Sequence, residues 1–119
     1  MPGTREGAIG RIEAEYDSGN FIGMLAERVA IPTESQEPDQ LPELYRYLRD
    51  NIGPYLTPLG YDCEIFDNPV EGGGPFLVAS RIEDPSRPTL LAYGHGDVCL
   101  LYTSPSPRDK RQSRMPSSA

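Results

Sequence analysis

Residues 89–98 read TLLAYGHGDV, and this stretch decides the expected fold. Its first half, Thr89–Tyr93, is apolar at successive positions, which is typical of a strand in the centre of a sheet covered by helices on both sides. Its second half is a glycine-rich turn that holds the only histidine, His95, and a carboxylate at Asp97. In open α/β sheets, reactive groups gather beyond the carboxyl ends of strands. We therefore expect an α/β layered fold with a site directly after this strand.

Two shorter strands are expected upstream. Apolar and polar residues alternate from Tyr61 to Ile65, which is the pattern of a half-buried strand. A glycine-rich loop at residues 72–75 leads to a second strand over residues 76–82, and residues 83–86 have the composition of a turn. The loop lacks the Gly-Lys-Ser/Thr ending of a phosphate-binding loop, so we interpret it as a connection between strands.

The segments before the strands have the apolar periodicity of helices. Apolar residues recur three and four positions apart from Ile9 to Tyr16 and again from Phe21 to Val29, with an Asp-Ser-Gly interruption between them. This pattern predicts two short helices or one broken helix. Pro32 ends the second run, because proline disfavours the helical conformation of the residue before it.

A longer helix is expected next. Asp39 is an acceptable cap, Pro42 stands in the first turn, and Gly60 is placed to end the helix. Gly53-Pro54 lies inside the segment and is expected to kink or restart it. The expected buried stripe consists of Leu41, Leu44, Leu48, Ile52, Leu56 and Leu59.

The charge divides the chain into residues 1–98 and residues 99–119. The first part holds seven Arg, no Lys and 17 Asp plus Glu, a formal net charge of −10, whereas the second holds four basic groups and one acidic group, a net of +3. Nucleic acid is not expected as a partner of the acidic part, because phosphate binding needs clustered positive charge. No apolar run up to Asp17 is long enough for a signal peptide or a membrane span, so we expect a soluble, cytoplasmic protein with no membrane partner.

His95 and Asp97 are the candidates for chemistry. Neutral imidazole is a common zinc ligand, and a carboxylate two residues further on can accept the other ring N–H and so fix the tautomer and orientation of the ring. Gly94 and Gly96 would let the backbone turn tightly around a metal. The triplet alone also fits a plainer role, because a lone histidine in a glycine-rich turn is usually structural or solvated.

Two motifs connect the chain to a known family. Residues 31–35 read Ile-Pro-Thr-Glu-Ser after the helical opening, and residues 94–98 read Gly-His-Gly-Asp-Val after the buried strand. With the helix-strand-strand order between them, residues 21–98 resemble the family of two-zinc amidohydrolases and exopeptidases that includes glutamate carboxypeptidases, aminoacylases, acetylornithine deacetylase and succinyl-diaminopimelate desuccinylase. The resemblance implies that residues 1–98 are the N-terminal piece of a three-layer αβα zinc-exopeptidase-like catalytic domain, with two helical segments and then three strands.

The resemblance also implies a reaction. It makes His95 a ligand of one zinc and Asp97 the catalytic-site carboxylate that orients its imidazole. In the family, two zinc ions share a water or hydroxide, a glutamate is the general base, and the hydroxide attacks an amide carbonyl polarised by metal; cobalt or manganese can replace zinc. The implied activity is that of a hydrolase, a metallopeptidase or deacylase of small peptides or N-acyl amino acids, and family members often form homodimers through a separate lid domain.

Most of that machinery is not expected in this chain. A bridging aspartate, a Glu-Glu pair, another acidic ligand and a distal histidine should follow the first metal-binding motif, and none can be assigned here. One imidazole leaves most of a zinc coordination sphere to water. We therefore expect the chain by itself to be inactive.

Residues 99–119 depart from the family pattern and resemble the translation of a sequencing-library adaptor. The transposon end ctgtctcttatacacatct, whose first base completes the preceding valine codon, reads CLLYTS, and ccgagcccacgagac reads the PSPRD that follows. An index and the flow-cell end account for the rest. The Pro and Ser content and the lack of apolar periodicity predict a disordered, non-native tail.

Two alternatives stay open. The basic run Asp109–Arg114 can instead be a disordered arm that binds nucleic acid or an acidic partner. The whole chain can instead be a noncatalytic α/β interaction or binding module in which His95 is only structural. A continuation with Asp, Glu-Glu and His ligands favours the hydrolase, whereas a stop or an unrelated linker after Val98 favours the module.

Overall fold

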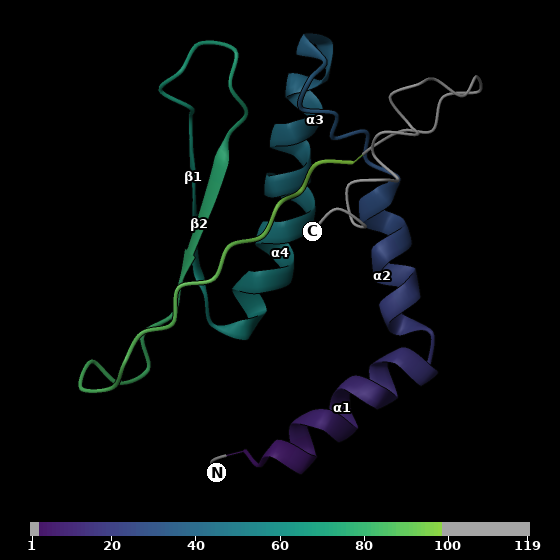
Figure 1. The fold of residues 1–119 in the computed structure, drawn as a ribbon, viewed down its shortest axis with the longest axis vertical. Coiled ribbons are helices and arrows are strands. Elements are labelled where there is room, and N and C mark those ends of the chain that lie inside the picture. The colour runs from purple at the N-terminus through teal and green to yellow at the C-terminus, as the bar shows by residue number, and fades with distance from the viewer. Residues whose placement is uncertain (1–2, 99–119) are drawn as a thin grey trace, which may run out of the picture.

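The computed structural model of the protein describes residues 3–98. These residues form helices followed by a β-hairpin, an α/β arrangement as predicted (Figure 1). The predicted disordered tail, residues 99–119, lies outside the described residues. The elements are α1 (Arg5–Asp17), α2 (Asn20–Val29), a 3-10 turn (Pro38–Gln40), α3 (Leu41–Arg46), a π-helical segment (Tyr47–Ile52), α4 (Gly53–Leu56), a second 3-10 turn (Thr57–Leu59), β1 (Asp62–Phe66) and β2 (Phe76–Ser80).

The expected break between the first two helices lies at Gly19. The Thr4 side chain caps α1 by accepting a 3.0 Å hydrogen bond from the Gly7 amide. Gly19 has a φ of +85°, a left-handed conformation that glycine adopts without steric cost, so the chain turns there before α2 begins. The rings of Tyr16 and Phe21 meet across this turn with their centroids 6.2 Å apart. The prediction of two short helices is therefore confirmed.

A nearly continuous helix is formed by α3, the π-helical segment and α4. The sequence predicts a kink or restart at Gly53-Pro54; the helix type changes there from π to α, while Ile52 and Gly53 keep helical backbone angles and the helix continues. Gly60 ends the helical stretch with a φ of +90°, as predicted. The predicted cap is wrong: Asp39 lies inside the preceding 3-10 turn, and no side chain caps α3.

The strands β1 and β2 pair antiparallel, with Glu64 opposite Val78 at the centre of the register. The predicted alternation is confirmed, since Cys63 and Ile65 are half-buried and their neighbours along β1 are exposed. The second strand ends at Ser80, two residues earlier than predicted. One face of the hairpin therefore packs against the helix and the other faces solvent.

The long helix lies between the hairpin and α2 (Figure 1). On the hairpin side, Gly53 is buried, and a Cβ added there would lie 3.7 Å from Leu77. On the α2 side, Arg28 Nε donates a 3.1 Å hydrogen bond to Asn51 Oδ1, and the guanidinium lies 4.7 Å from the centre of the Tyr55 ring. These contacts fix the helix relative to both neighbours.

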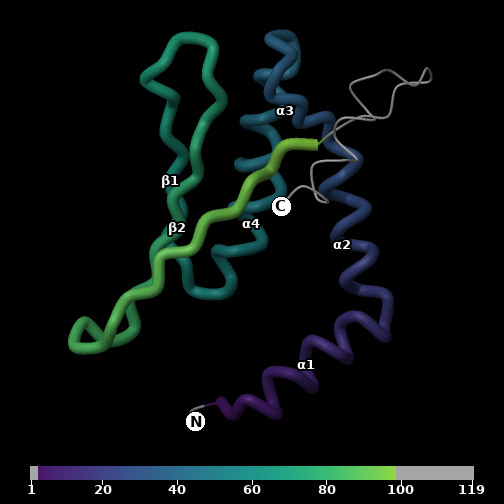
Figure 2. Tube along the Cα trace, in the orientation of Figure 1, coloured from purple at the N-terminus to yellow at the C-terminus, as the bar shows by residue number. Residues whose placement is uncertain are grey.

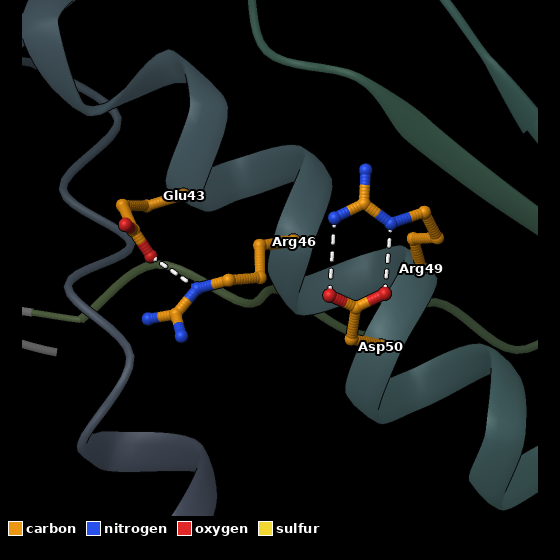
Figure 3. A network of polar contacts seen from close by, with 4 residues as sticks. All are labelled: Glu43, Arg46, Arg49 and Asp50. Carbon is orange, nitrogen blue, oxygen red and sulfur yellow. Dashed lines mark hydrogen bonds and ion pairs between the residues drawn. The ribbon is translucent and has the colours of Figure 1, made fainter.

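Two ion pairs lie along the same helix (Figure 3). Arg46 Nε lies 2.6 Å from Glu43 Oε2, and Arg49 donates two hydrogen bonds to the carboxylate of Asp50. The hydrogen bonds from Arg49 hold the pKa of Asp50 below its ordinary value of 3.8. Exposed pairs of this kind contribute little to stability, and both of these join residues of the same helix.

The predicted third strand is wrong. Thr89–Tyr93 has no regular secondary structure and pairs with no other strand within residues 3–98. Leu90, Leu91 and Tyr93 are 91%, 94% and 83% exposed. Figure 2 shows the segment, in yellow-green, running from the foot of the hairpin past the long helix towards α2. A strand that is apolar on both faces needs covering layers on both sides, and the described part of the chain does not supply them.

No hydrophobic side chain within residues 3–98 is fully buried. The predicted stripe of the long helix is half-buried at five of its positions, and its last member, Leu59, is 48% exposed. A cavity of about 440 Å³ opens between the helix and the inner face of the hairpin, lined by Leu48, Cys63, Ile65 and Leu77 among others. The described residues therefore form helices against a two-stranded sheet, without the closed core of a three-layer domain.

None of the helices within residues 3–98 has both the length and the apolar character needed to cross a bilayer.

Candidate functional site

The turn after α2 and the segment around His95 lie in contact. Thr33 and Gly96 are 63 residues apart in the sequence, yet Thr33 Oγ1 donates a 2.6 Å hydrogen bond to the Gly96 carbonyl oxygen. Thr33 is 1% exposed, and no hydrophobic side chain within residues 3–98 is buried to that extent. A buried hydroxyl is costly unless it is hydrogen-bonded, and the Gly96 carbonyl meets that requirement. The two sequence motifs are thus joined directly.

Two further hydrogen bonds join the same segments. The backbone N–H of Ser35 donates to Asp97 Oδ1 at 2.8 Å, and the backbone N–H of Val98 donates to the Thr33 carbonyl oxygen at 3.1 Å. The bond to Asp97 has an ionised acceptor and is therefore of the stronger kind. We refer to Thr33, Ser35, Gly96, Asp97 and Val98 as the clasp. Within the clasp, Thr33 and Ser35 bind the three residues that directly follow His95.

The long helix supports the clasp through Tyr47, the first residue of the π-helical segment. A Cβ added at Gly96 would lie 2.5 Å from Tyr47 Cε1, closer than real Cβ atoms approach. Neither Gly94 nor Gly96 has a positive φ. A side chain at position 96 would therefore force the Tyr47 ring to move, and the expected need for special backbone freedom is not observed.

His95 is exposed beside the clasp. Its Nδ1 accepts a 3.2 Å hydrogen bond from the backbone N–H of Asp97, and its ring meets the Tyr93 ring edge-on with the centroids 6.4 Å apart. Because Nδ1 is the acceptor, the neutral imidazole carries its proton on Nε2. The Asp97 carboxylate faces the Ser35 amide in this arrangement, and its predicted bond to the imidazole is not formed.

The described residues do not form a zinc site by themselves. Protein zinc sites use three or four side-chain ligands, and residues 3–98 contain no cluster of three or more His, Cys, Asp or Glu side chains that could hold a metal ion. Ligation through Nε2 of His95 would also require its proton to move to Nδ1, with an acceptor there. The predicted roles of His95 as a metal ligand and Asp97 as a catalytic-site carboxylate stay predictions.

Part of this site can be predicted from the sequence. The sequence places His95 and Asp97 together, and it indicates residues 31–35 as one of the two family motifs. The sequence gives no sign that the partner of the Thr33 hydroxyl is the carbonyl of Gly96. Tyr47 was not singled out, because its contact with Gly96 depends on how the helix is placed in space, which no local sequence signal encodes.

Comparisons of the chain with protein-family models, with curated proteins and with solved structures find no match. The two motifs and the geometry of the clasp are therefore the observations from which a function can be proposed.

Proposed function

We propose that residues 1–98 are the N-terminal piece of a metal-dependent hydrolase of peptide or N-acyl amino-acid amide bonds, with a three-layer αβα catalytic domain. In this proposal His95 is one metal ligand and Asp97 is a carboxylate of the same site. The remaining ligands and the general base lie outside residues 3–98, so the 119-residue chain has no hydrolase activity of its own.

The observation that carries the proposal is the direct contact between the two motifs. The sequence resemblance rests on Pro32-Thr33-Glu34-Ser35 and on Gly94-His95-Gly96-Asp97-Val98, which are far apart in the chain. Three hydrogen bonds join them in space. Two motifs that belong to one catalytic centre are expected to meet in this way, whereas two chance matches have no reason to do so.

A noncatalytic binding module is the second candidate, and one observation favours it. The Nδ1 of His95 accepts a backbone N–H from Asp97, which is a structural role for a histidine. In that case His95 stabilises the turn and binds no metal. The two candidates differ in whether loss of the imidazole removes metal and activity from the protein encoded by the intact gene.

The test uses the reading frame recovered from source DNA across the Val98 codon. The expressed protein is assayed for bound zinc and for hydrolysis of N-acetyl amino acids and dipeptides. We expect bound zinc and amide hydrolysis, both lost in His95→Ala, and kcat/KM lowered about tenfold or more in Asp97→Asn. Glu13→Gln, the same carboxylate-to-amide change at an exposed position of α1, is the matched control and should leave both unchanged.

Two results would count against the proposal. One is a protein that binds no zinc and hydrolyses none of these amides, which favours the binding module. The other is hydrolysis by the 119-residue chain that His95→Ala abolishes, because this would place the whole catalytic centre within a chain that the proposal treats as incomplete.

A further inference from the structure

Few contacts other than the clasp fix the segment that carries His95. Residues 89–98 form no helix and no strand, and Leu90, Leu91 and Tyr93 are more than 80% exposed. The conformation of His95 is therefore not set by a sheet, as it would be after a paired strand. The hydrogen bonds that fix this segment to the rest of the described chain come from the turn after α2.

The three bonds act on different groups of three successive residues. The Thr33 hydroxyl holds the carbonyl of Gly96, the Ser35 amide holds the side chain of Asp97, and the Thr33 carbonyl holds the amide of Val98. The amide of Asp97 then donates to Nδ1 of His95. Fixing the backbone on both sides of Asp97 fixes the direction of that N–H and, through it, the imidazole.

We propose that Thr33 and Ser35 are positioning residues for His95, acting through Gly96 and Asp97. Neither is a catalytic residue: the Thr33 hydroxyl is satisfied by the Gly96 carbonyl, and Ser35 contributes its backbone N–H to the clasp. Thr33 orients the peptide of Gly96. Ser35 keeps the Asp97 carboxylate away from the imidazole and leaves the Asp97 amide as the partner of Nδ1.

This inference goes beyond the proposed function and does not depend on it, because it concerns how the His95 ring is held and not what the ring binds. The hydrogen bonds can be tested in the 119-residue chain without metal or substrate. If the NMR test contradicts the role of the clasp, the hydrolase proposal is unaffected. If the protein shows no hydrolase activity, the role of the clasp is unaffected.

The experiment measures the tautomer of the neutral His95 ring by ¹⁵N NMR of the full 119-residue chain. His95 is the only histidine, so the imidazole signals need no assignment. Thr33→Val removes the hydroxyl at nearly constant volume, whereas Thr33→Ser keeps the hydroxyl and removes the methyl group. Ser35→Pro removes the donating N–H, and Ser35→Ala keeps it. Backbone amides at the centre of the hairpin, Glu64 and Val78, report whether each variant retains the fold.

We expect one dominant tautomer, with the proton on Nε2, in the wild type, Thr33→Ser and Ser35→Ala. Thr33→Val and Ser35→Pro should give averaged ring signals while the hairpin amides stay in place. A purely structural role for the turn would leave the ring signals of any folded variant unchanged, and that result overturns the inference.

A second measurement on the wild type needs no variant. Hydrogen exchange at the amides of Ser35 and Val98 should be slower than in an unstructured chain by about tenfold or more, because both are donors in the clasp. Exchange of both amides at the unstructured rate overturns the inference even if every variant unfolds.

Discussion

The hydroxyl of Thr33 and the carbonyl of Gly96 form the hydrogen bond that joins two distant parts of this chain, with 2.6 Å between the oxygens. Thr33 belongs to the turn after α2, and Gly96 lies between His95 and Asp97. The buried side chain is thus a polar one, whereas the apolar side chains of residues 3–98 are exposed or half-buried. Polar contacts, more than apolar packing, hold the candidate site together.

Removal of this hydroxyl should destabilise the fold. Thr33→Val leaves the half-buried Gly96 carbonyl without its donor and is expected to lower the free energy of unfolding by about 1–2 kcal/mol. Urea unfolding followed by circular dichroism measures the change. Thr33→Ser keeps the donor and should cost less than half as much. A loss in Thr33→Ser as large as the loss in Thr33→Val would show that the hydroxyl does not account for the stabilisation by itself, and it would contradict this prediction.

The two glycines around His95 should respond differently to the same substitution. Gly96→Ala places a Cβ against the Tyr47 ring and is expected to cost about 1–3 kcal/mol, because overpacking forces the ring to move. A Cβ added at Gly94 has no atom within 4 Å, so Gly94→Ala should leave the free energy of unfolding unchanged or raise it slightly. Urea unfolding of the pair checks this. A second change, Tyr47→Ala, should remove most of the cost of Gly96→Ala; if it does not, the ring is not the cause.

The elements that the sequence predicts correctly are those determined by neighbouring residues. The break between α1 and α2 follows from Gly19, and the end of the long helix follows from Gly60. The alternation of β1 follows in the same way from burial on one face. Each signal acts within a few residues, so no knowledge of the tertiary structure is needed to recognise it.

The failures have the opposite origin. The apolar residues of Thr89–Tyr93 predict a central strand only if a sheet and two helical layers enclose them, and residues 3–98 do not supply that enclosure. The Thr33–Gly96 hydrogen bond spans 63 residues and is invisible to any local pattern. The sequence indicates both motifs, but it does not predict that they lie in contact.

A hydrogen bond between Tyr45 and Asp67 predicts a pH dependence at the junction of helix and hairpin. The Tyr45 hydroxyl donates to the Asp67 carboxylate, and this bond raises the pKa of Tyr45 above its ordinary value of 10.0. The neutral phenol is the favoured form in the fold. The associated stability is therefore fully present below pH 10 and is lost as the pH rises through the raised pKa.

Tyrosinate absorbance measures this shift. The difference between the titration curves of wild type and Tyr45→Phe isolates Tyr45, and Asp67→Ala should return its pKa towards 10.0. Asp62→Ala, which removes an exposed carboxylate at the start of β1, is the control and should leave the curve in place. If the pKa of Tyr45 is the same in Asp67→Ala as in the wild type, the hydrogen bond to Asp67 is not the cause of the shift.

The 119-residue chain should be marginally stable. Within residues 3–98 no hydrophobic side chain is fully buried, and large apolar residues such as Leu90, Leu91 and Val70 are more than two-thirds exposed. Little apolar area is then available to offset the conformational entropy of folding. We expect a broad thermal transition and strong binding of a hydrophobic dye. A sharp, cooperative melt of a monomer that binds no dye would contradict this expectation.

The central claim is that residues 1–98 begin a metal-dependent amide hydrolase and that residues 99–119 are not part of it. The most direct measurement is to amplify the locus from source DNA across the Val98 codon and to sequence it without a transposon-prepared library. We predict a reading frame that continues past Val98 into an aspartate, a Glu-Glu pair and a distal histidine as further ligands. Finding Cys99–Ala119 in the genomic sequence would contradict the claim and make the chain a short, noncatalytic protein.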